Sequence, residues 1–277
     1  MPYRCASCAE VLDRWAPRCP ACGLRGGILD GATWEDDAPS RSRFLEAIRV
    51  ERQHYLRTAI PALDAMLGGG FAVGSTTLLG GRPGMGKSTL LLQAFAGIAV
   101  TAQRPVIYAA CEEPDARIRL RAETRVTIPR RRVLMLHAPT LEELGREIEA
   151  RPTLAAVAVD TISRLETEAP VGPRGRLVYC AHALTIWAPE RKLAVLLLAH
   201  MNRRGTIAGS LTAEHLVDVV LHLSGRRGSA RRILTADKNR YGGTDMAVEF
   251  TMGSRGLVDG RVLTSDTEEP RSPEQAP

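Results

Sequence analysis

The sequence lacks a long apolar run and lacks a recognisable export signal. No stretch of 18 or more apolar residues occurs among its 277 residues, and the N-terminus does not have the architecture of a signal peptide. We therefore expect a soluble, cytoplasmic protein with no membrane partner. Because that compartment keeps thiols reduced, we expect none of the six cysteines to form a disulfide.

Lysine is almost absent as well. Arginine and lysine together number 37, yet only three of these residues are lysine: Lys87, Lys192 and Lys238. The formal net charge of +6 favours a polyanionic partner, although a biased genome composition would also favour arginine. Where arginine is the usual cation, a lysine inside a motif indicates a chemical requirement, and Lys87 and Lys238 both lie in motifs.

A glycine-rich stretch has the pattern of a phosphate-binding loop. Gly81, four residues and then Gly86-Lys87-Ser88 match G-x-x-x-x-G-K-[ST], with an apolar strand pattern before the loop and a helical pattern after it. In such a loop the backbone amides surround phosphates, the lysine reaches them and the serine hydroxyl binds magnesium. We predict that ATP and Mg²⁺ bind to Gly81, Arg82, Pro83, Gly84, Met85, Gly86, Lys87, Ser88 and Thr89.

Two acidic residues follow apolar strand patterns. Val106–Ala110 leads to Glu112, and a strand pattern that is apolar on both faces, 154–159, ends at Asp160. Because ligands of a parallel sheet bind at the carboxyl ends of its strands, we predict that Asp160 holds magnesium through water. Glu112 is placed to deprotonate the attacking water. The alternative for Glu112 is a surface residue that, with Glu113, opens the next helix.

The first 22 residues contain two C-x-x-C pairs. Cys5 and Cys8 form the first pair and, after ten residues, Cys19 and Cys22 form the second. Four thiolates at this spacing are typical of a structural Zn²⁺ site, and a segment with so few core-forming side chains needs such a metal to stay folded. A thioredoxin-like redox pair is the alternative, but it requires a single C-x-x-C inside a βαβ pattern.

Two basic, glycine-containing segments, 163–176 and 201–209, are expected to be loops at neighbouring strand ends. Their arginines are Arg164, Arg174, Arg176, Arg203 and Arg204. Arginines in such loops can contact the phosphates of single-stranded DNA without reading its sequence. Neither loop has an aromatic residue, so base stacking is not expected. The alternative is that these arginines are solvated loop charges.

The segment Asp237–Gly243 carries Lys238 and Arg240 and follows a strand pattern late in the chain, at Ile233–Ala236. We expect this segment to emerge far from its own phosphate loop and to face the nucleotide of a neighbouring subunit. Cations supplied in this way neutralise charge on the transferring phosphoryl group. The alternative is a basic turn that contacts only DNA phosphates.

The patterns divide the chain into four parts. We predict a four-cysteine zinc ribbon over residues 1–29, a linker over 30–56, an α/β ATPase domain over 57–263 and a disordered acidic tail over 264–277. Alternating strand and helix patterns in the third part favour a mostly parallel sheet flanked by helices.

Over nearly its whole length the sequence resembles the RadA (Sms) family of bacterial RecA-related recombination ATPases. The resemblance rests on the zinc knuckles, the phosphate loop, the Glu112-Glu113 pair, the GTIAG stretch at 205–209 and the KNRYG stretch at 238–242. The last of these has tyrosine where the family has phenylalanine. The resemblance implies a RecA-like P-loop ATPase core and a hexameric ring that hydrolyses ATP at subunit boundaries. It also implies movement on single-stranded DNA during branch migration.

The family usually carries a Lon-protease-like C-terminal domain, and this sequence stops soon after the predicted core, so we expect a short RadA-like form. We expect His200, which follows a buried strand pattern, to sense the γ-phosphate, and Lys238 and Arg240 to act on the next subunit. A RecA recombinase filament is a candidate partner. The alternative function is a KaiC-like regulatory ATPase that recruits protein partners according to its nucleotide state, and stimulation of hydrolysis by single-stranded DNA distinguishes the two.

Overall fold

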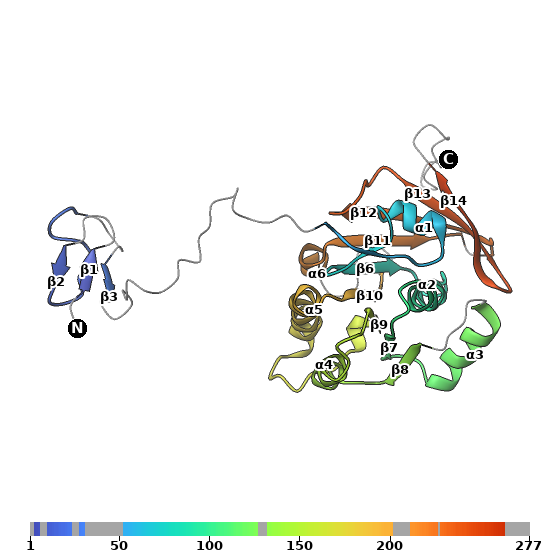
Figure 1. The fold of residues 1–277 in the computed structure, drawn as a ribbon, viewed down its shortest axis with the longest axis horizontal. Coiled ribbons are helices and arrows are strands. Elements are labelled where there is room, and N and C mark those ends of the chain that lie inside the picture. Colours follow the sequence, from blue (N-terminus) through green and yellow to red (C-terminus); the bar gives the residue numbers. More distant parts are fainter. Residues whose placement is uncertain are drawn as a thin grey trace, which may run out of the picture. The chain divides into compact units, whose positions relative to one another are not determined.

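A computed structural model describes residues 3–5, 10–23, 28–30, 52–126, 132–201, 211–226 and 228–263 of the chain. The chain divides into two compact units, Met1–Arg52 and Gln53–Pro277 (Figure 1). The predicted tail, 264–277, and most of the second basic loop lie outside the described residues. Among the described helices, none has the length and apolar character needed to cross a membrane.

The N-terminal unit contains a three-stranded antiparallel sheet. Its strands lie in the order β2-β1-β3 and are β1 (Tyr3–Cys5), β2 (Val11–Leu12) and β3 (Ile28–Asp30). Cys5 and Cys19 are buried, and the partly buried Tyr3 and Leu12 pack against them. An apolar cluster of this size buries little surface, so a sheet this small needs an additional source of stability.

A nine-stranded sheet forms the centre of the larger unit. In order across the sheet, its strands are β14 (Gly256–Leu263), β13 (Ala247–Gly253), β12 (Arg231–Asn239), β11 (Val219–Ser224), β6 (Thr76–Gly81), β10 (Ala194–His200), β9 (Ala156–Asp160), β7 (Val106–Ala110) and β8 (Val133–His137). The strands from β11 to β8 are parallel, and β12, β13 and β14 extend the sheet as antiparallel strands. A separate short pair joins β4 (Tyr55–Leu56) to β5 (Phe71–Ala72).

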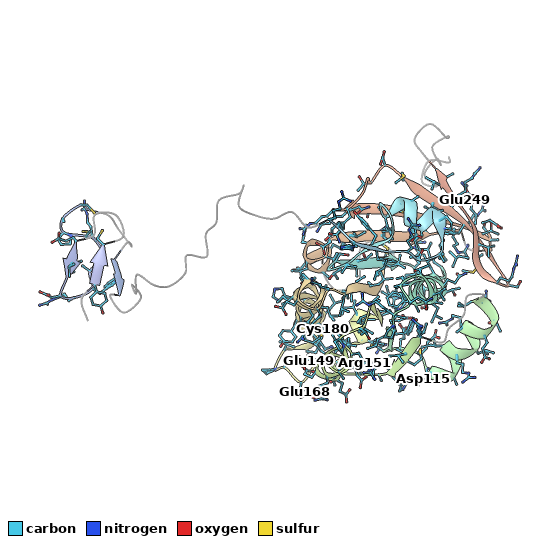
Figure 2. The ribbon with its side chains drawn as sticks, in the orientation of Figure 1. Asp115, Glu149, Arg151, Glu168, Cys180 and Glu249 are labelled. Carbon is cyan, nitrogen blue, oxygen red and sulfur yellow. The ribbon has the colours of Figure 1, made fainter. Side chains whose placement is uncertain are left out.

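Helices cover both faces of this sheet (Figure 1), which explains why its central strands are mostly apolar and almost entirely buried. One face packs against α1 (Pro61–Met66), α2 (Lys87–Thr101) and α3 (Asp115–Arg125). The other packs against α4 (Leu141–Glu149), α5 (Pro173–Glu190) and α6 (Leu211–Leu216). Every residue of β6, β7 and β9 is buried, as expected for parallel strands covered on both sides. Cys180 of α5 is buried in the apolar cluster between the sheet and α4, α5 and α6 (Figure 2).

The structure corrects two expectations about where elements begin and end. Arg174 and Arg176 lie on α5 and not in a loop, because the helix starts at Pro173. Proline suits the first position of a helix, where its missing N–H has no helical partner. Lys238 lies within β12, which continues to Asn239, and not in a segment after the strand. The sequence patterns also gave no indication of β14.

Candidate nucleotide-binding site

The loop between β6 and α2 follows a path that only glycine accommodates at three points. Gly84 and Gly86 have φ angles of +79° and +102°, which lie in the left-handed region. A side chain on Gly86 would meet the methyl group of Met252, and a Cβ on Gly81 would lie 2.5 Å from the carbonyl oxygen of Leu223. The loop leads directly into the first turn of α2, where backbone amides have no helical partner and favour an anion.

Lys87, the first residue of α2, folds back over the loop. Its Nζ donates to the carbonyl oxygens of Gly81 at 2.7 Å and of Arg82 at 3.2 Å. Burial lowers the pKa of Lys87, and the carboxylates of Asp160 and Glu112 oppose that shift. The ammonium group is therefore held at the loop with two acidic side chains close by.

Asp160, at the carboxyl end of β9, is buried between two hydroxyl groups. It accepts a hydrogen bond from the hydroxyl of Tyr108, and the side chain of Ser88 lies close by. Burial raises the pKa of Asp160, and the polar contacts with Tyr108 and Ser88 act in the opposite direction. The Ser88 hydroxyl and the Asp160 carboxylate are hard oxygen donors brought together beside the phosphate loop, which is the donor chemistry that Mg²⁺ prefers. The pair therefore fits the predicted magnesium site.

Glu112, His200 and Lys87 form a chain of polar contacts across the site. Nε2 of His200 lies 2.9 Å from Oε2 of Glu112, and Nδ1 of His200 lies 3.4 Å from Nζ of Lys87. The hydroxyl of Thr161 donates to the same Glu112 oxygen at 3.4 Å. Glu112 follows β7, Thr161 follows β9 and His200 ends β10, so three neighbouring strand ends position this carboxylate.

The neighbouring acid, Glu113, has a different partner. Nη2 of Arg121 donates to both of its carboxylate oxygens, at 2.8 and 2.6 Å. Because Arg121 occupies both oxygens of Glu113, Glu112 is the carboxylate of the pair that contacts the histidine and the lysine. The geometry therefore favours Glu112 over Glu113 as the base.

A cavity of about 430 Å³ connects these groups. It is lined by Pro83, Gly84, Gly86, Lys87, Ser88, Thr89, Glu112, Glu113, Arg121, Arg125, Asp160, His200 and Met252. Arg121, Arg125 and Met252 were not predicted from the sequence. The two arginines are four residues apart on α3, a helical spacing that could have indicated them, whereas Met252 reaches the cavity only through the β13–β14 hairpin. Gly81, Arg82 and Met85 belong to the loop but do not line the cavity.

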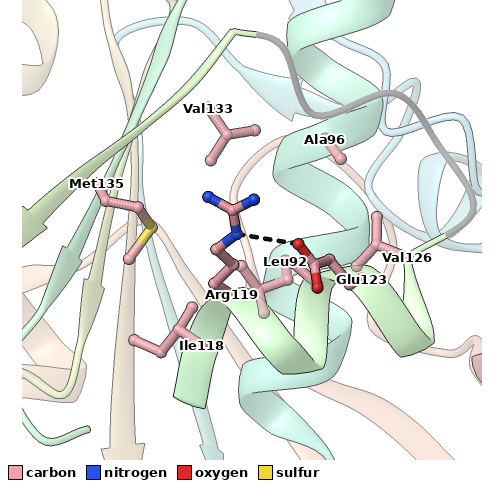
Figure 3. Close-up of a pocket in the computed structure, with 9 residues that line it drawn as sticks. Leu92, Ala96, Ile118, Arg119, Glu123, Val126, Val133 and Met135 are labelled. Atoms are coloured by element: carbon pink, nitrogen blue, oxygen red, sulfur yellow. Dashed lines mark hydrogen bonds and ion pairs between the residues drawn. The ribbon is translucent and has the colours of Figure 1, made fainter. Parts of the chain in front are cut away.

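A second cavity, of about 250 Å³, lies between α2, α3 and β8 (Figure 3). Its lining is mostly apolar and includes Ile118, Val133 and Met135. The ion pair between Arg119 and Glu123, with Nε and Oε1 2.9 Å apart, lies at its side. The arginine there is already neutralised, so this cavity lacks the donors that a polyphosphate requires.

In the N-terminal unit, three of the four predicted zinc ligands come together. The sulfur atoms of Cys5, Cys19 and Cys22 all lie within 4.8 Å of one another, and those of Cys5 and Cys22 are 3.6 Å apart. Tetrahedral zinc with sulfur ligands at about 2.3 Å requires sulfur atoms about 3.8 Å apart, so the cluster has the size of a zinc site. Cys8 lies outside the described residues.

The predicted DNA-contacting arginines are only partly described. Arg164 is exposed and belongs to the 3₁₀ helix Ile162–Arg164. Arg176 on α5 forms an ion pair with Glu166, which competes with any contact to a phosphate. Arg203 and Arg204 and the side chain of Arg174 lie outside the described residues.

Lys238 and Arg240 lie away from the cavity. In the sheet, Lys238 pairs with Val220, and Val220 pairs with Leu78 of β6. Lys238 therefore lies level with Leu78, before the carboxyl end of β6 at Gly81, where the phosphate loop begins. Nζ of Lys238 donates to three carbonyl oxygens at the end of α6 and just beyond it, those of Glu214, His215 and Val217, at 3.3, 3.1 and 2.5 Å. Arg240 forms an ion pair with Asp218 in which Nη1 and Oδ1 are 2.9 Å apart.

The glycine loop, the lysine, the serine and aspartate oxygens and the adjacent glutamate together define a P-loop ATPase site at the carboxyl edge of a mostly parallel sheet. A family model described as an AAA domain matches residues 38–206, and the chain belongs to this family.

Three curated relatives, all named DNA repair protein RadA, are similar over nearly the whole chain. The protein of Rickettsia bellii is 34% identical over 266 residues, which cover 93% of this chain and 59% of that protein. The protein of Treponema pallidum is 34% identical over 92% and 57% of the two chains, and that of Mycobacterium tuberculosis H37Rv is 35% identical over 95% and 57%. The resemblance to RadA is therefore confirmed, and the chain spans less than two thirds of the length of these relatives.

Two solved structures have the same fold. The RadB recombinase has a TM-score of 0.58 at 22% identity and covers 73% of this chain and 98% of its own. A KaiC-like protein from Pyrococcus horikoshii has a TM-score of 0.62 at 20% identity and covers 75% and 99%. The predicted RecA-like core, a mostly parallel sheet flanked by helices, is confirmed.

Proposed function

We propose that this protein is an ATP-driven motor that acts on single-stranded DNA in recombination and repair. The observation that carries the proposal is the contact chain from Lys87 through His200 to Glu112, beside the Ser88–Asp160 pair. A cation for the phosphates, a carboxylate for the attacking water and oxygen donors for a metal thus meet in one cavity.

In this function Lys87 holds the β- and γ-phosphates, and Ser88 and Asp160 hold Mg²⁺. A magnesium ion held by these two side chains would neutralise charge on the phosphate oxygens. Glu112 accepts a proton from the water that attacks the γ-phosphorus atom. His200 contacts both Lys87 and Glu112. It is the last residue of β10, and residues 202–210 follow it in the chain. His200 is thus the residue through which the state of the phosphate is transmitted toward that segment.

The DNA role rests on the relatives and on charge. The three RadA relatives are named for DNA repair, and the net charge of this chain is +6. Branch migration is the particular activity that we propose. Arg203 and Arg204, together with Arg164, Arg174 and Arg176, are the proposed contacts to DNA phosphates. The N-terminal unit binds one Zn²⁺ through Cys5, Cys8, Cys19 and Cys22.

The active form that we propose is a hexameric ring in which Lys238 and Arg240 act on the neighbouring subunit. Neither residue lines the cavity of its own subunit. This supports the assignment, because a cation that does not reach its own nucleotide is free to contact the nucleotide of the neighbouring subunit. The contacts of Lys238 with α6 carbonyls must then be exchanged for phosphate contacts when the ring forms.

Stimulation of ATP hydrolysis tests the proposed function. Hydrolysis by the purified full chain should rise severalfold with single-stranded DNA of mixed sequence, and duplex DNA of equal length should have a smaller effect. Lys87→Ala, measured in parallel, gives the background of contaminating ATPases. A rate of hydrolysis that neither DNA changes would instead favour the KaiC-like alternative, a regulatory ATPase that recruits proteins.

A further inference from the structure

Arg232 on β12 is a buried cation that contacts the phosphate loop from behind. The residue is only 8% exposed. Its Nε donates to the carbonyl oxygen of Met85 at 3.0 Å, and its Nη1 donates to the carbonyl oxygens of Ser229 and Arg231 at 2.6 and 2.8 Å. A Cβ on Gly225 would lie 2.8 Å from Cδ of Arg232, so the side chain is tightly enclosed. Arg232 therefore connects the loop to the turn that begins β12.

The contact with Met85 fixes the direction of a peptide group. Met85 and Gly86 share a trans peptide, in which the C=O and the N–H point in opposite directions. Arg232 holds the C=O, and Met85 does not line the cavity, whereas Gly86 does. Holding the carbonyl on the Arg232 side directs the Gly86 N–H toward the cavity. In a phosphate loop, that N–H is one of the donors to the nucleotide.

The charge of Arg232 acts in the same direction. A guanidinium group stays protonated when buried. Among the described residues its partners are backbone carbonyls, and no ion pair of those residues includes it. A buried cation without a carboxylate partner leaves positive potential beside the loop, which favours a polyphosphate. The adjacent Arg231 differs, because it is exposed and its Nη2 pairs with Oε2 of Glu249 at 2.7 Å.

We infer that Arg232 is a positioning residue for the phosphate loop, which orients the Gly86 amide and adds positive potential for the phosphates of the nucleotide. The inference rests on the proposed nucleotide site. It predicts that affinity for nucleotide phosphates depends on Arg232, although the side chain does not reach the cavity.

The test is calorimetric binding of MgADP to the full chain, measured well below the unfolding temperature of each variant. Arg232→Gln should weaken MgADP binding at least tenfold. Arg232→Lys keeps the positive charge, but a single ammonium group cannot donate to the carbonyl oxygens of both Met85 and Ser229 as the guanidinium group does. MgADP binding by this variant should therefore weaken about fivefold. Arg231→Gln is the matched control and should bind within twofold of wild type, because it removes only an exposed ion pair.

The outcomes separate the two claims. Failure of the wild-type chain to bind MgADP would contradict the nucleotide site itself. Wild-type affinity in a folded Arg232→Gln variant, whatever its unfolding temperature, would contradict the positioning role and leave the nucleotide site intact. If Arg232→Gln does not fold, the decision falls to Arg232→Lys: affinity within twofold of wild type contradicts the inference, and a loss of about fivefold supports it.

Discussion

The two motif lysines lie toward opposite ends of the parallel strands, and their surroundings differ. Lys87, beside the carboxyl end of β6, has two carbonyl contacts, a histidine at 3.4 Å and two acidic groups nearby. Lys238, toward the amino end, has three carbonyl contacts that use all three of its donors. Lys87 is therefore arranged around an anion site in its own subunit. Lys238 donates to carbonyl oxygens at the end of a helix, and under the proposed assignment it meets a phosphate only in a neighbouring subunit.

This contrast separates the proposed MgATP-binding groups, which a single chain supplies, from a basic pair that is proposed to act across a subunit boundary. The groups that we propose for the phosphates, the magnesium ion and the attacking water, Lys87, Ser88, Asp160 and Glu112, all line one cavity. The basic pair Lys238 and Arg240 is satisfied by α6 and by Asp218, respectively. Changes at the carboxyl edge should therefore alter nucleotide binding even by an isolated subunit, whereas changes at Lys238 should alter hydrolysis only in the assembled protein.

The largest effect is expected for Lys87→Ala. Removal of the ammonium group removes the phosphate ligand, and ATP hydrolysis should fall to the background rate. Phosphate release from ATP measures it. Lys192→Asn is the matched control, because Lys192 lies in a turn after α5 with φ of +51°, a conformation that asparagine tolerates, and its activity should stay at the wild-type level. Substantial hydrolysis by Lys87→Ala would mean that the loop is not the catalytic site.

Glu112→Gln should slow hydrolysis about a hundredfold or more while ATP binding is kept, because the change removes the base and leaves the phosphate ligands in place. Turnover and nucleotide affinity are measured on the same preparation. Glu113→Gln is the comparison, and it should slow turnover less, since Glu113 is paired with Arg121. The reverse order of the two variants would transfer the role of base to Glu113.

Loss of zinc, unlike loss of magnesium, should affect the N-terminal unit alone. Freshly purified protein should contain about one equivalent of zinc, and Cys19→Ser should lose it, because three sulfur ligands hold zinc more weakly than four. Elemental analysis measures the metal, and Cys180→Ser is the control for thiol loss elsewhere, since Cys180 is buried on α5. Less than half an equivalent in the wild type, with no change in Cys19→Ser, would exclude a zinc site.

The smallest effect is expected for the double variant Arg203→Ala, Arg204→Ala. Its binding to single-stranded DNA should depend less steeply on salt, by somewhat under one unit of slope for each lost phosphate contact. Fluorescence anisotropy over a series of salt concentrations gives the slope. The control is Arg191→Ala, which removes an exposed arginine paired with Glu149. Equal slopes for the wild type and the double variant would direct the search for the DNA path to other residues.

The parts of the fold that could be predicted from sequence are those with strong local patterns. The strand at Val106–Ala110 has the predicted bounds, and the loop from Gly81 to Ser88 joins the expected strand and helix. Asp160 and His200 could be placed because each ends an apolar strand, and parallel strands share one carboxyl edge.

The parts that could not be predicted depend on contacts between distant segments. Met252 approaches the loop because β13 and β14 form a hairpin at the sheet edge, and Arg232 reaches Met85 across 147 positions of sequence. The start of α5 was missed because Gly172 and Pro173 suggest a loop when read locally, although proline is favourable in the first turn.

The most direct test of the contrast between the two lysines is a mixing experiment. Lys87→Ala subunits cannot use their own site, and Lys238→Ala subunits cannot serve the site of a neighbour. Each variant alone should be inactive, and mixing them should restore hydrolysis wherever an intact loop meets an intact Lys238. Recovery should be largest near equal proportions of the two variants. No recovery, with subunit exchange verified by fluorescence transfer between labelled variants, would contradict the action of Lys238 on a neighbouring nucleotide.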